Sequence, residues 1–469
     1  MQSSFVKYDP LTVHYEALLN TFANGTTKPV EWRIKQLQGL GLMLQEKSDE
    51  FEKALFEDLG KPAIESHITE IGFLQAEISH TLKNISKWTK PKRVSVPAAV
   101  QPASAWIRPE PLGTVLIIAP WNYPLMLCLS PLIGALAAGN TVIVKPSELA
   151  PATSAVIAKL LTEYVDVRAI RVVEGGVEET TKLLEFRFDH IFYTGSGRVA
   201  RIIAAAAAKH LTPTTLELGG KSPLYIDETV SMAAAAKRIV WAKFMNAGQT
   251  CVAPDYILAS KETLTLLETH LHDAVQELYG NAVKQNPDYG RIINRAQFDR
   301  LKSYLDDGRI VVGGESDAEE LFIAPTVLAD VEIDSGVMEG EIFGPILPLI
   351  EVADVDEAIA YVNMNDKPLG AYVFSENSEV RKQWELETSS GALTFGAPVL
   401  HLTVPDLPFG GVGESGMGAY HGKLSFDSFS HQKAVLSKPL APDTLGPTIM
   451  PPFTALKERL VRNVLGKIR

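Results

Sequence analysis

Cysteine is almost absent from this sequence of 469 residues, which contains only Cys128 and Cys251. So few thiols exclude a disulfide framework and a thiolate-rich zinc cluster, and they fit a reducing compartment. A secretory signal is also lacking, because the opening MQSSFVKYDPLTVHYEALL has no basic segment followed by an apolar core and a cleavage site. We therefore expect a cytoplasmic protein without a metal site.

An excess of positive charge is lacking as well. The chain carries 44 Lys and Arg against 56 Asp and Glu, a formal net charge of −12 at pH 7. Such a charge repels a phosphate backbone, so nucleic acid is not an expected partner. The hydrophobic content of 46% in a chain of this length is enough to fill the cores of about three domains.

No hydrophobic run is continuous enough to span a membrane. Pro111 to Val144 carries no charge and is longer than the roughly 20 residues of a spanning helix. Internal prolines and a Gly-Asn turn interrupt it, however. This pattern predicts a strand at Thr114 to Ala119, a helix from about Pro124 and a second strand at Thr141 to Val144, with both strands buried on two faces.

The remaining pattern indicates an α/β fold. From Pro29 to Thr89 apolar residues recur at helical spacing with charges between them, and no chemistry is signalled there. After Gly113, short apolar strands alternate with helical stretches in two successive series that end near Ser390. Alternation of this kind predicts mainly parallel sheets covered by helices on both sides. We therefore expect two α/β domains.

Reactive or glycine-rich residues concentrate in six segments, which in chain order are PWNYP, VKPSE, FYTGSGRVA, LELGGKSP, NAGQTC and EIFGP. In this order and at these separations they resemble the aldehyde dehydrogenase superfamily. The longer strings NAGQTCVAPDY and YHGKLSFDSFSH are similar to its class 3 branch. The resemblance covers the chain from about residue 30 to residue 432.

The resemblance implies a domain layout. Residues 1–93 and 112–217 would form a Rossmann-like NAD(P)-binding domain, and 218–396 a catalytic domain carrying the cysteine. Residues 94–111 and 397–469 would form bridging or oligomerisation segments and a C-terminal tail. The likeness to class 3 also implies a homodimer, formed through Val94 to Pro111 and Leu407 to Gly422.

Cys251 is the expected nucleophile. A free thiol has a pKa of about 8.5, so only a few per cent is thiolate at neutral pH unless a neighbour activates it. The resemblance implies that Cys251 attacks the aldehyde carbon, that the thiohemiacetal gives a hydride to the nicotinamide, and that water hydrolyses the resulting thioester. Cys128, in the apolar segment LMLCLSPL, is expected to be a buried structural cysteine.

Two further residues are expected to take part in the chemistry. Glu217 precedes a Gly-Gly pair and is expected on an irregular turn; the resemblance makes it the general base, provided burial raises its pKa. Asn122 follows the strand LIIAP, where parallel sheets place their ligands. The resemblance makes its amide an oxyanion donor together with the backbone N–H of Cys251. Loss of one such donor costs on the order of 3 kcal/mol, so Asn122→Ala should lower turnover about a hundredfold or more.

The dinucleotide site has one misleading signal. Gly195, Gly197 and Ala200 spell G-x-G-x-x-A, and the acidic Glu217 follows about 20 residues later, as in the dinucleotide fingerprint. That match would assign Glu217 to a ribose. The resemblance implies instead that Gly195 and Ser196 lie close to the pyrophosphate.

The other cofactor residues follow from the resemblance alone. Lys145 and Glu148 of VKPSE are expected beside the adenine ribose, Glu341 at the nicotinamide ribose and Phe343 near the nicotinamide ring. NAD and NADP both remain open, because Glu148 could favour NAD or swing aside.

The expected reaction is oxidation of medium- or long-chain aliphatic, aromatic or terpenoid aldehydes to carboxylic acids, with Tyr123 and His421 bordering the substrate channel. A CoA-acylating dehydrogenase is an alternative, although Glu217 favours hydrolysis. A non-catalytic protein that kept the fold and a cysteine hydrolase using His270 or His272 are further alternatives.

The tail has an amphipathic pattern, with Leu456, Leu460, Val464 and Ile468 on one helical side and basic residues around them. Packing on the protein itself or on a partner is favoured over a membrane-surface helix. We expect at most peripheral membrane contact.

Overall fold

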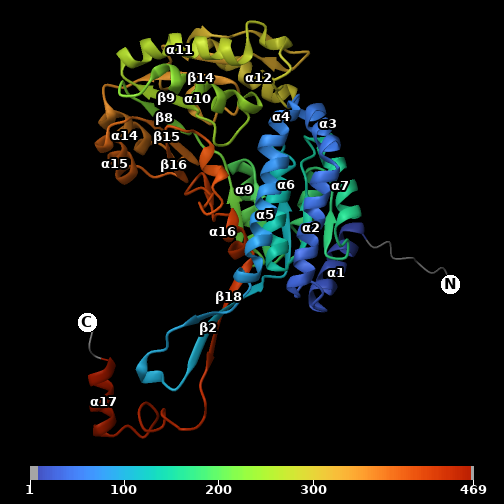
Figure 1. The fold of residues 1–469 in the computed structure, drawn as a ribbon, viewed down its shortest axis with the longest axis vertical. Helices are drawn as coiled ribbons and strands as arrows, with labels where there is room; N and C mark the ends of the chain where they lie inside the picture. The colour runs from blue at the N-terminus through green and yellow to red at the C-terminus, as the bar shows by residue number, and fades with distance from the viewer. Residues whose placement is uncertain (1–8, 466–469) are drawn as a thin grey trace, which may run out of the picture.

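A computed structural model describes residues 9–465 (Figure 1). The N-terminal part is helical, as its periodicity predicts, and consists of α1 (Pro10–Ala23), α2 (Val30–Glu46), α3 (Ser48–Leu59), α4 (Ala63–Ser66), a π-helical turn η1 (His67–Ile71) and α5 (Gly72–Trp88). The break between α3 and α5 falls at Gly60, which has a left-handed φ of 61° and ends α3. That break places the short segments α4 and η1 beside the site described below.

The first sheet has the order β17-β7-β6-β3-β4-β5. Its strands are β3 (Thr114–Ile118), β4 (Thr141–Lys145), β5 (Ile170–Val172), β6 (His190–Thr194), β7 (Thr214–Glu217) and β17 (Gly416–Met417). All neighbours are parallel except β17, which runs antiparallel to β7. The uncharged run from Pro111 to Val144 is therefore strand, helix and strand, as predicted, with α6 (Met126–Ala138) between β3 and β4.

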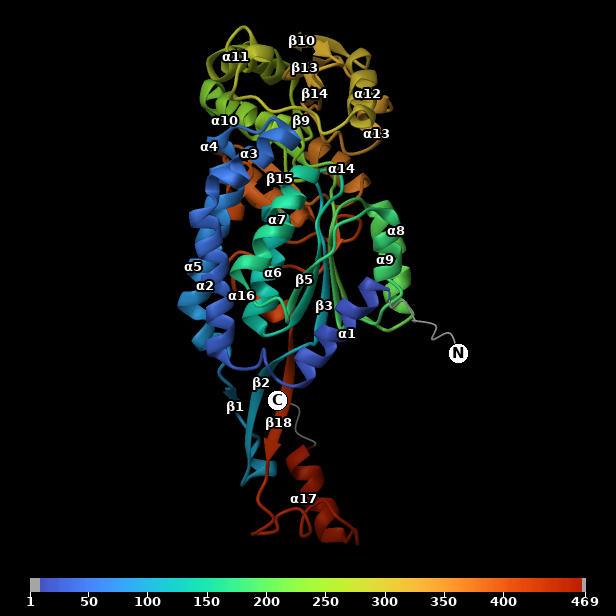
Figure 2. The ribbon, with the colours of Figure 1, turned by 90° about the vertical axis from the view of Figure 1, so that its right-hand side faces the viewer.

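Helices cover both faces of this sheet (Figure 2). One face carries α2, α5, α6 and α7 (Pro151–Tyr164), and their apolar side chains share a core with Val115, Ile117 and Phe192 of the sheet. The other face carries α1, α8 (Val177–Leu183) and α9 (Gly197–Ala208), which pack on Leu116 and Ile143. Burial on both faces explains why these strands read as continuous apolar runs.

The second sheet has the order β10-β13-β14-β9-β8-β15-β16 and is parallel except for β10. Its strands are β8 (Pro223–Ile226), β9 (Tyr256–Ala259), β10 (Arg309–Val312), β13 (Thr326–Ala329), β14 (Ile346–Glu351), β15 (Gly370–Phe374) and β16 (Ala392–Phe395). The helices around it are α10 (Met232–Phe244), α11 (Lys261–Tyr279), α12 (Arg295–Ser303), α13 (Gly336–Glu339), α14 (Val355–Met364) and α15 (Ser378–Glu387). A small hairpin of β11 (Ser316–Asp317) and β12 (Phe322–Ile323) adjoins it.

A third, antiparallel sheet forms an arm that projects from the rest of the molecule (Figure 1). It consists of β1 (Lys92–Val94), β2 (Ser104–Pro111) and β18 (Ser430–Ser437), in the order β1-β2-β18. The last helix, α17 (Ala455–Leu465), lies at the far end of this arm, whereas α16 (Gly422–Ser428) packs on α6. The expected fold class, two parallel-sheet α/β domains with a small bridging element, is confirmed.

Residues 9–465 contain neither a candidate membrane span nor a candidate metal cluster. Within that range no helix combines the length and apolarity that crossing a bilayer requires. The same residues contain no group of His, Cys, Asp and Glu side chains arranged to hold a metal ion. Ile468, which the sequence analysis placed on the apolar side of the tail, lies outside the described residues.

Candidate active site

Predicted site residues gather at one edge of the six-stranded sheet. Lys145 and Glu217 are the last residues of β4 and β7, Gly195 directly follows β6, and Asn122 follows β3. The register aligns Ile118 with Lys145, so these strand ends lie side by side. This is the carboxyl edge, where open parallel sheets bind their ligands.

Cys251 reaches this edge from the second sheet, on the loop between α10 and β9. The loop begins with an irregular turn in which Asn246 and Ala247 have positive φ angles of 52° and 51°. Such angles are costly for residues other than glycine and persist only where the surroundings hold them. Here the Asn246 backbone N–H donates to Glu65 Oε1 at 2.8 Å, so a buried contact fixes the turn before Cys251.

Hydrogen bonds tie the Cys251 loop directly to the Asn122 turn. Asn122 Nδ2 donates to the Gln249 carbonyl at 3.1 Å, and Asn246 Nδ2 donates to the Asn122 carbonyl at 2.8 Å. The Tyr123 hydroxyl lies 2.6 Å from Thr250 Oγ1. The candidate site is therefore built between the two sheets, with groups from each.

Two cavities meet at Cys251, which lines both. The first has a volume of about 130 Å³ and an almost wholly apolar lining, which includes Phe73, Tyr123, Met126, Trp241, Leu402, Phe409 and His421. The second has a volume of about 230 Å³, and the predicted site residues on its wall are Asn122, Gly195, Ser196, Glu217, Glu341 and Phe343. A further apolar cavity of about 300 Å³ shares Ile68, Phe73 and Leu402 with the first.

The surroundings of Cys251 favour its neutral form. Burial raises the pKa of the thiol, and the carboxylates of Glu341 and Glu217 raise it further, against weaker opposition from backbone N–H groups. The free protein therefore holds Cys251 as a thiol near neutral pH. The activation that a nucleophilic thiolate requires must then accompany the binding of a ligand.

Glu217 lies at the end of a strand, so the expectation of an irregular turn at this residue is wrong. The backbone of Glu217 pairs with Thr194 on one side and Gly416 on the other, and the turn begins only at Leu218. Neither carboxylate oxygen has a hydrogen-bond partner within the described chain. Burial raises the pKa of this carboxyl group well above its usual value, as a general base for work near neutral pH requires.

Glu341 and Phe343 lie on the loop between α13 and β14. Burial, followed by the nearby Asp255, raises the pKa of Glu341 to about 8. A Cβ on Gly219 would lie 1.8 Å from Glu341 Oε2, so a larger residue there would displace the Glu341 carboxylate. Phe343 contacts the Trp121 ring edge to face, with centroids 5.3 Å apart.

The edge also offers groups suited to a dinucleotide. Lys145 is only 2% exposed, and its Nζ lies 2.7 Å from Glu148 Oε2, so it is not an ordinary surface lysine. Ser196 directly precedes α9, whose N-terminal N–H groups no side chain caps in the described structure. Free N–H groups at the start of a helix of this length bind phosphate oxygens well, so these residues fit a pyrophosphate and an adjoining ribose.

Tyr123 and His421 both line the apolar cavity, where the sequence analysis expected them. Burial raises the pKa of Tyr123 and lowers that of His421 to about 3, so both stay neutral near pH 7. Cys128 is buried in α6, as expected for a structural cysteine.

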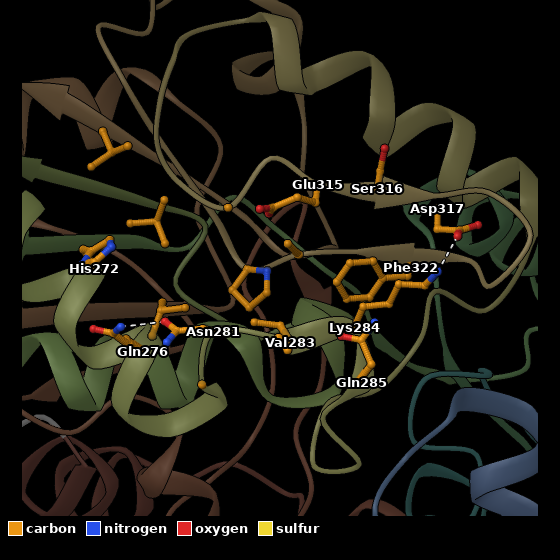
Figure 3. A pocket seen from close by; sticks show the side chains of 18 residues that line it. His272, Gln276, Asn281, Val283, Lys284, Gln285, Glu315, Ser316, Asp317 and Phe322 are labelled. Atoms are coloured by element: carbon orange, nitrogen blue, oxygen red, sulfur yellow. Dashed lines mark hydrogen bonds and ion pairs between the residues drawn. The ribbon is translucent and has the colours of Figure 1, made fainter.

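A larger cavity, of about 560 Å³, lies between the end of α11 and the β11–β12 hairpin and contains none of the predicted site residues (Figure 3). Its Lys284 is already paired with Asp317 at 2.6 Å and with Glu320 at 3.0 Å. His272 lines this cavity, away from those that meet at Cys251. That placement argues against a cysteine hydrolase that uses His272.

Three charged residues beside the site were not predicted from the sequence. Lys61, Glu65 and Glu70 belong to the helical region in which no chemistry was signalled, yet Lys61 and Glu70 are wholly buried. The sequence contains one weak signal for these residues. A Gly-Lys-Pro segment interrupts the amphipathic helical spacing, and the three charged residues lie in or shortly after it.

Two parallel-sheet α/β domains and a free, half-buried cysteine where an apolar and a polar cavity meet fit the class of α/β dehydrogenases that oxidise aldehydes. The model of the aldehyde dehydrogenase family matches residues 16–435. The chain belongs to this family, and it is an oxidoreductase by that membership.

Comparison with individual proteins agrees. The chain is 48% identical over 453 residues to aldehyde dehydrogenase family 3 member B1 of Homo sapiens, covering 97% of each chain. It is 47% identical to family 3 member A2 of Rattus norvegicus, covering 94% of this chain and 91% of the relative. Both relatives belong to family 3, which confirms the likeness to class 3.

Solved structures give the same result. The substrate-bound AldH of Staphylococcus aureus is 43% identical, with a TM-score of 0.95 over 97% of this chain and 100% of that one. An aldehyde dehydrogenase of Mycobacterium tuberculosis complexed with NAD+ is 29% identical, with a TM-score of 0.81 over 91% of this chain and 90% of that one.

Proposed function

We propose that the protein oxidises medium- or long-chain aliphatic, aromatic or terpenoid aldehydes to carboxylic acids, with NAD or NADP as oxidant. The observation that carries the proposal is the position of Cys251 where an apolar cavity meets a polar one. An aldehyde would enter with its apolar part in the first cavity, and the nicotinamide end of the dinucleotide would enter the second. Their reacting atoms would then meet at the thiol.

The nucleophile of the proposed reaction is Cys251 Sγ, which releases its proton to solvent and forms a bond to the aldehyde carbon as the carbonyl π bond opens and the oxygen gains negative charge. Asn122 is suited to hold that oxygen. One hydrogen of its amide is engaged by the Gln249 carbonyl at 3.1 Å, and an amide nitrogen carries two. The second hydrogen, together with the backbone N–H of Cys251, would stabilise the oxyanion.

The residues proposed to hold the dinucleotide are Ser196 with the start of α9, Lys145 with Glu148, Glu341 and Phe343. When bound, the dinucleotide supplies an acceptor for the hydride and a positive ring near the thiol. A positive charge there lowers the pKa of nearby acids, so it offsets the effect of Glu217 and Glu341 on Cys251. Loss of the hydride leaves a thioester on Sγ.

Glu217 is proposed to resolve the thioester. It shares the polar cavity with Cys251, and its raised pKa suits it to take a proton from a water molecule as that water attacks the thioester carbon. The C–S bond then breaks, and the acid is released with the thiol regenerated.

The assay that tests this proposal measures reduced-nicotinamide formation from hexanal, decanal and benzaldehyde, with NAD and NADP in parallel. We expect reduction by the native protein and none by Cys251→Ala. Comparison of the three aldehydes and the two cofactors ranks substrate size and cofactor preference. Absence of reduction with every pair, while labelled dinucleotide still binds, would favour a non-catalytic protein.

A second experiment separates hydrolysis from CoA acylation. With Glu217→Gln, we expect one equivalent of reduced nicotinamide per site, followed by arrest with an acyl group on Cys251 that intact-protein mass spectrometry detects. Native turnover that depends on added CoA would contradict hydrolysis and support the acylating alternative.

At the level of the whole chain, we propose that the domain division is the one stated from the sequence and that the protein is a cytoplasmic homodimer. The projecting arm supports the dimer, because β18 leaves one edge unpaired and such edges are usually covered.

A further inference from the structure

The geometry points to Lys61 and Glu70 as positioning residues of the active site. We infer that their buried ion pair fixes the turn that carries Asn122, and so aims the Asn122 amide at the substrate oxygen. This inference rests on the proposed function, in which Asn122 donates to the oxyanion. Neither residue touches the proposed substrate or dinucleotide cavities around Cys251.

The ammonium group of Lys61 contacts the first residues of the turn, Asn122 and Tyr123. Its Nζ pairs with Glu70, and both side chains have no exposed surface. The same Nζ donates to the Asn122 carbonyl at 3.3 Å and lies 4.1 Å from the centroid of the Tyr123 ring. An ammonium group has three hydrogens to donate and no acceptor, so its hydrogens are committed to Glu70 and to the residues of this turn.

Glu70 holds the end of the same turn. Its Oε2 accepts from the backbone N–H groups of Leu125 at 2.9 Å and Met126 at 3.0 Å. These are the groups that open α6, where a carboxylate is well placed. The ion pair therefore spans the turn from Asn122 to Met126.

The Asn122 carbonyl is held from two directions, which fixes the orientation of the residue. Lys61 Nζ donates to it on one side, and Asn246 Nδ2 donates at 2.8 Å on the other. A carbonyl oxygen has two lone pairs, so both are occupied and the adjoining peptide plane cannot rotate freely. The side-chain amide of Asn122 then needs only one bond, to Gln249, to be set in place.

A role confined to stability would not require charged residues here. Two charges removed from water cost free energy that their attraction only partly offsets, and apolar side chains of similar size often stabilise as well. What an apolar pair does not supply is a donor for the Asn122 carbonyl and acceptors for two backbone N–H groups.

A double-mutant cycle tests the inference. Glu70→Gln and Lys61→Met are each measured in the native background and in an Asn122→Ala background, with decanal at saturating dinucleotide. Each change is expected to lower kcat about tenfold or more in the native background and less than about twofold after Asn122 is lost, because coupled residues are not additive. Dinucleotide affinity, measured by fluorescence, should stay close to native in all variants.

Asp58→Asn is the matched control. Asp58 is a partly buried carboxylate that accepts from two backbone N–H groups at the start of α7, Ala152 at 3.0 Å and Thr153 at 2.8 Å. Like Glu70, Asp58 accepts from two backbone N–H groups at the start of a helix, but that helix does not follow the Asn122 turn. Asp58→Asn should therefore change kcat little. Equal losses of kcat in both backgrounds, no loss in the native one, or a loss in Asp58→Asn as large as that in Glu70→Gln would overturn the inference.

A crystal structure of Lys61→Met gives a readout that needs no activity. We expect the Asn122 amide to leave the Gln249 carbonyl. An unmoved Asn122 would overturn the inference even in a protein that oxidised no aldehyde, so failure of the positioning role is distinguishable from failure of the proposed function.

Discussion

At the scale of single residues, the acid–base state of Cys251 depends on burial and on carboxyl groups that line the cavity proposed for the dinucleotide. Burial disfavours the thiolate, and Glu341 adds to this effect once it ionises near pH 8, so the resting thiol is protected from oxidants and alkylating agents, which attack thiolates. The same carboxylates line the cavity proposed for the dinucleotide. Reactivity and cofactor binding are therefore coupled through electrostatics.

Removal of one of these charges should increase the reactivity of the thiol. Above pH 8, where Glu341 is ionised, the neutral Glu341→Gln should lower the pKa of Cys251, because a nearby negative charge raises the pKa of a thiol. Iodoacetamide alkylation of Cys251 at a fixed pH above 8 should then be faster than in the native protein. Glu339→Gln, an exposed neighbour, is the control. An unchanged or slower alkylation in Glu341→Gln would contradict the expectation.

Glu148 offers a test of cofactor choice. Its carboxylate is partly exposed and is held by Lys145 at 2.7 Å. If the pair lies at the adenine ribose as proposed, a 2′-phosphate would meet a negative charge, and repulsion near a surface amounts to a few kcal/mol. Glu148→Gln should therefore raise kcat/KM for NADP relative to NAD by about tenfold or more. Steady-state assays with both cofactors measure the ratio, and an unchanged ratio would place the ribose elsewhere.

At the scale of elements, the sequence predicted regular structure well where local signals agree. One of the helical stretches of the second predicted series forms α11, which Ser260 caps by accepting from the backbone N–H of Thr263. The strand, helix and strand at Thr114 to Val144 also followed from local pattern. These elements could be predicted because proline and glycine mark their ends, and the effect of proline and glycine on the backbone is confined to a few neighbouring residues.

The sequence did not predict features set by long-range packing. Lys61 and Glu70 looked like solvent-facing charges because burial of a charge depends on partners far away in the chain, here the turn after β3. Glu217 was expected in a turn because a Gly-Gly pair follows it closely. Its backbone pairs instead with Thr194 of β6 and with Gly416 of β17, some 200 residues away, and these pairings keep it in β7. Roles of the site residues came from resemblance to a family, since residue type alone left several alternatives.

The helix α17 leaves two apolar side chains exposed on one side. Leu456 and Leu460 were expected to pack, yet they are 68% and 44% exposed. We predict that a partner protomer covers them, so replacement of both by Asp should weaken the dimer in sedimentation velocity. Glu458→Ala, on the opposite side of the helix, is the control. An unchanged dimer with loss of binding to anionic lipid vesicles would support a membrane-surface helix instead.

At the scale of the whole molecule, the arm of β1, β2 and β18 presents an apolar side chain at its free edge. Leu436 of β18 is 59% exposed, and burial of a leucine contributes about 1.5–3 kcal/mol. Leu436→Lys should therefore raise the dimer dissociation constant about tenfold or more, as measured by analytical ultracentrifugation. Leu266→Lys, an exposed leucine of α11 at the opposite end of the molecule from the arm (Figure 1), should leave it unchanged. A native protein that sediments only as a monomer would contradict the proposed dimer.

The placement of Asn122 and Cys251 on loops of different sheets has a consequence for how activity is regained after denaturation. Each sheet has its own hydrophobic core and can acquire secondary structure separately, but the bonds from Asn122 and Asn246 form only when the two bodies have docked. During refolding, far-UV ellipticity should thus recover ahead of turnover. The delay between the recovery of ellipticity and the recovery of turnover measures how long the two domains take to dock into one active site.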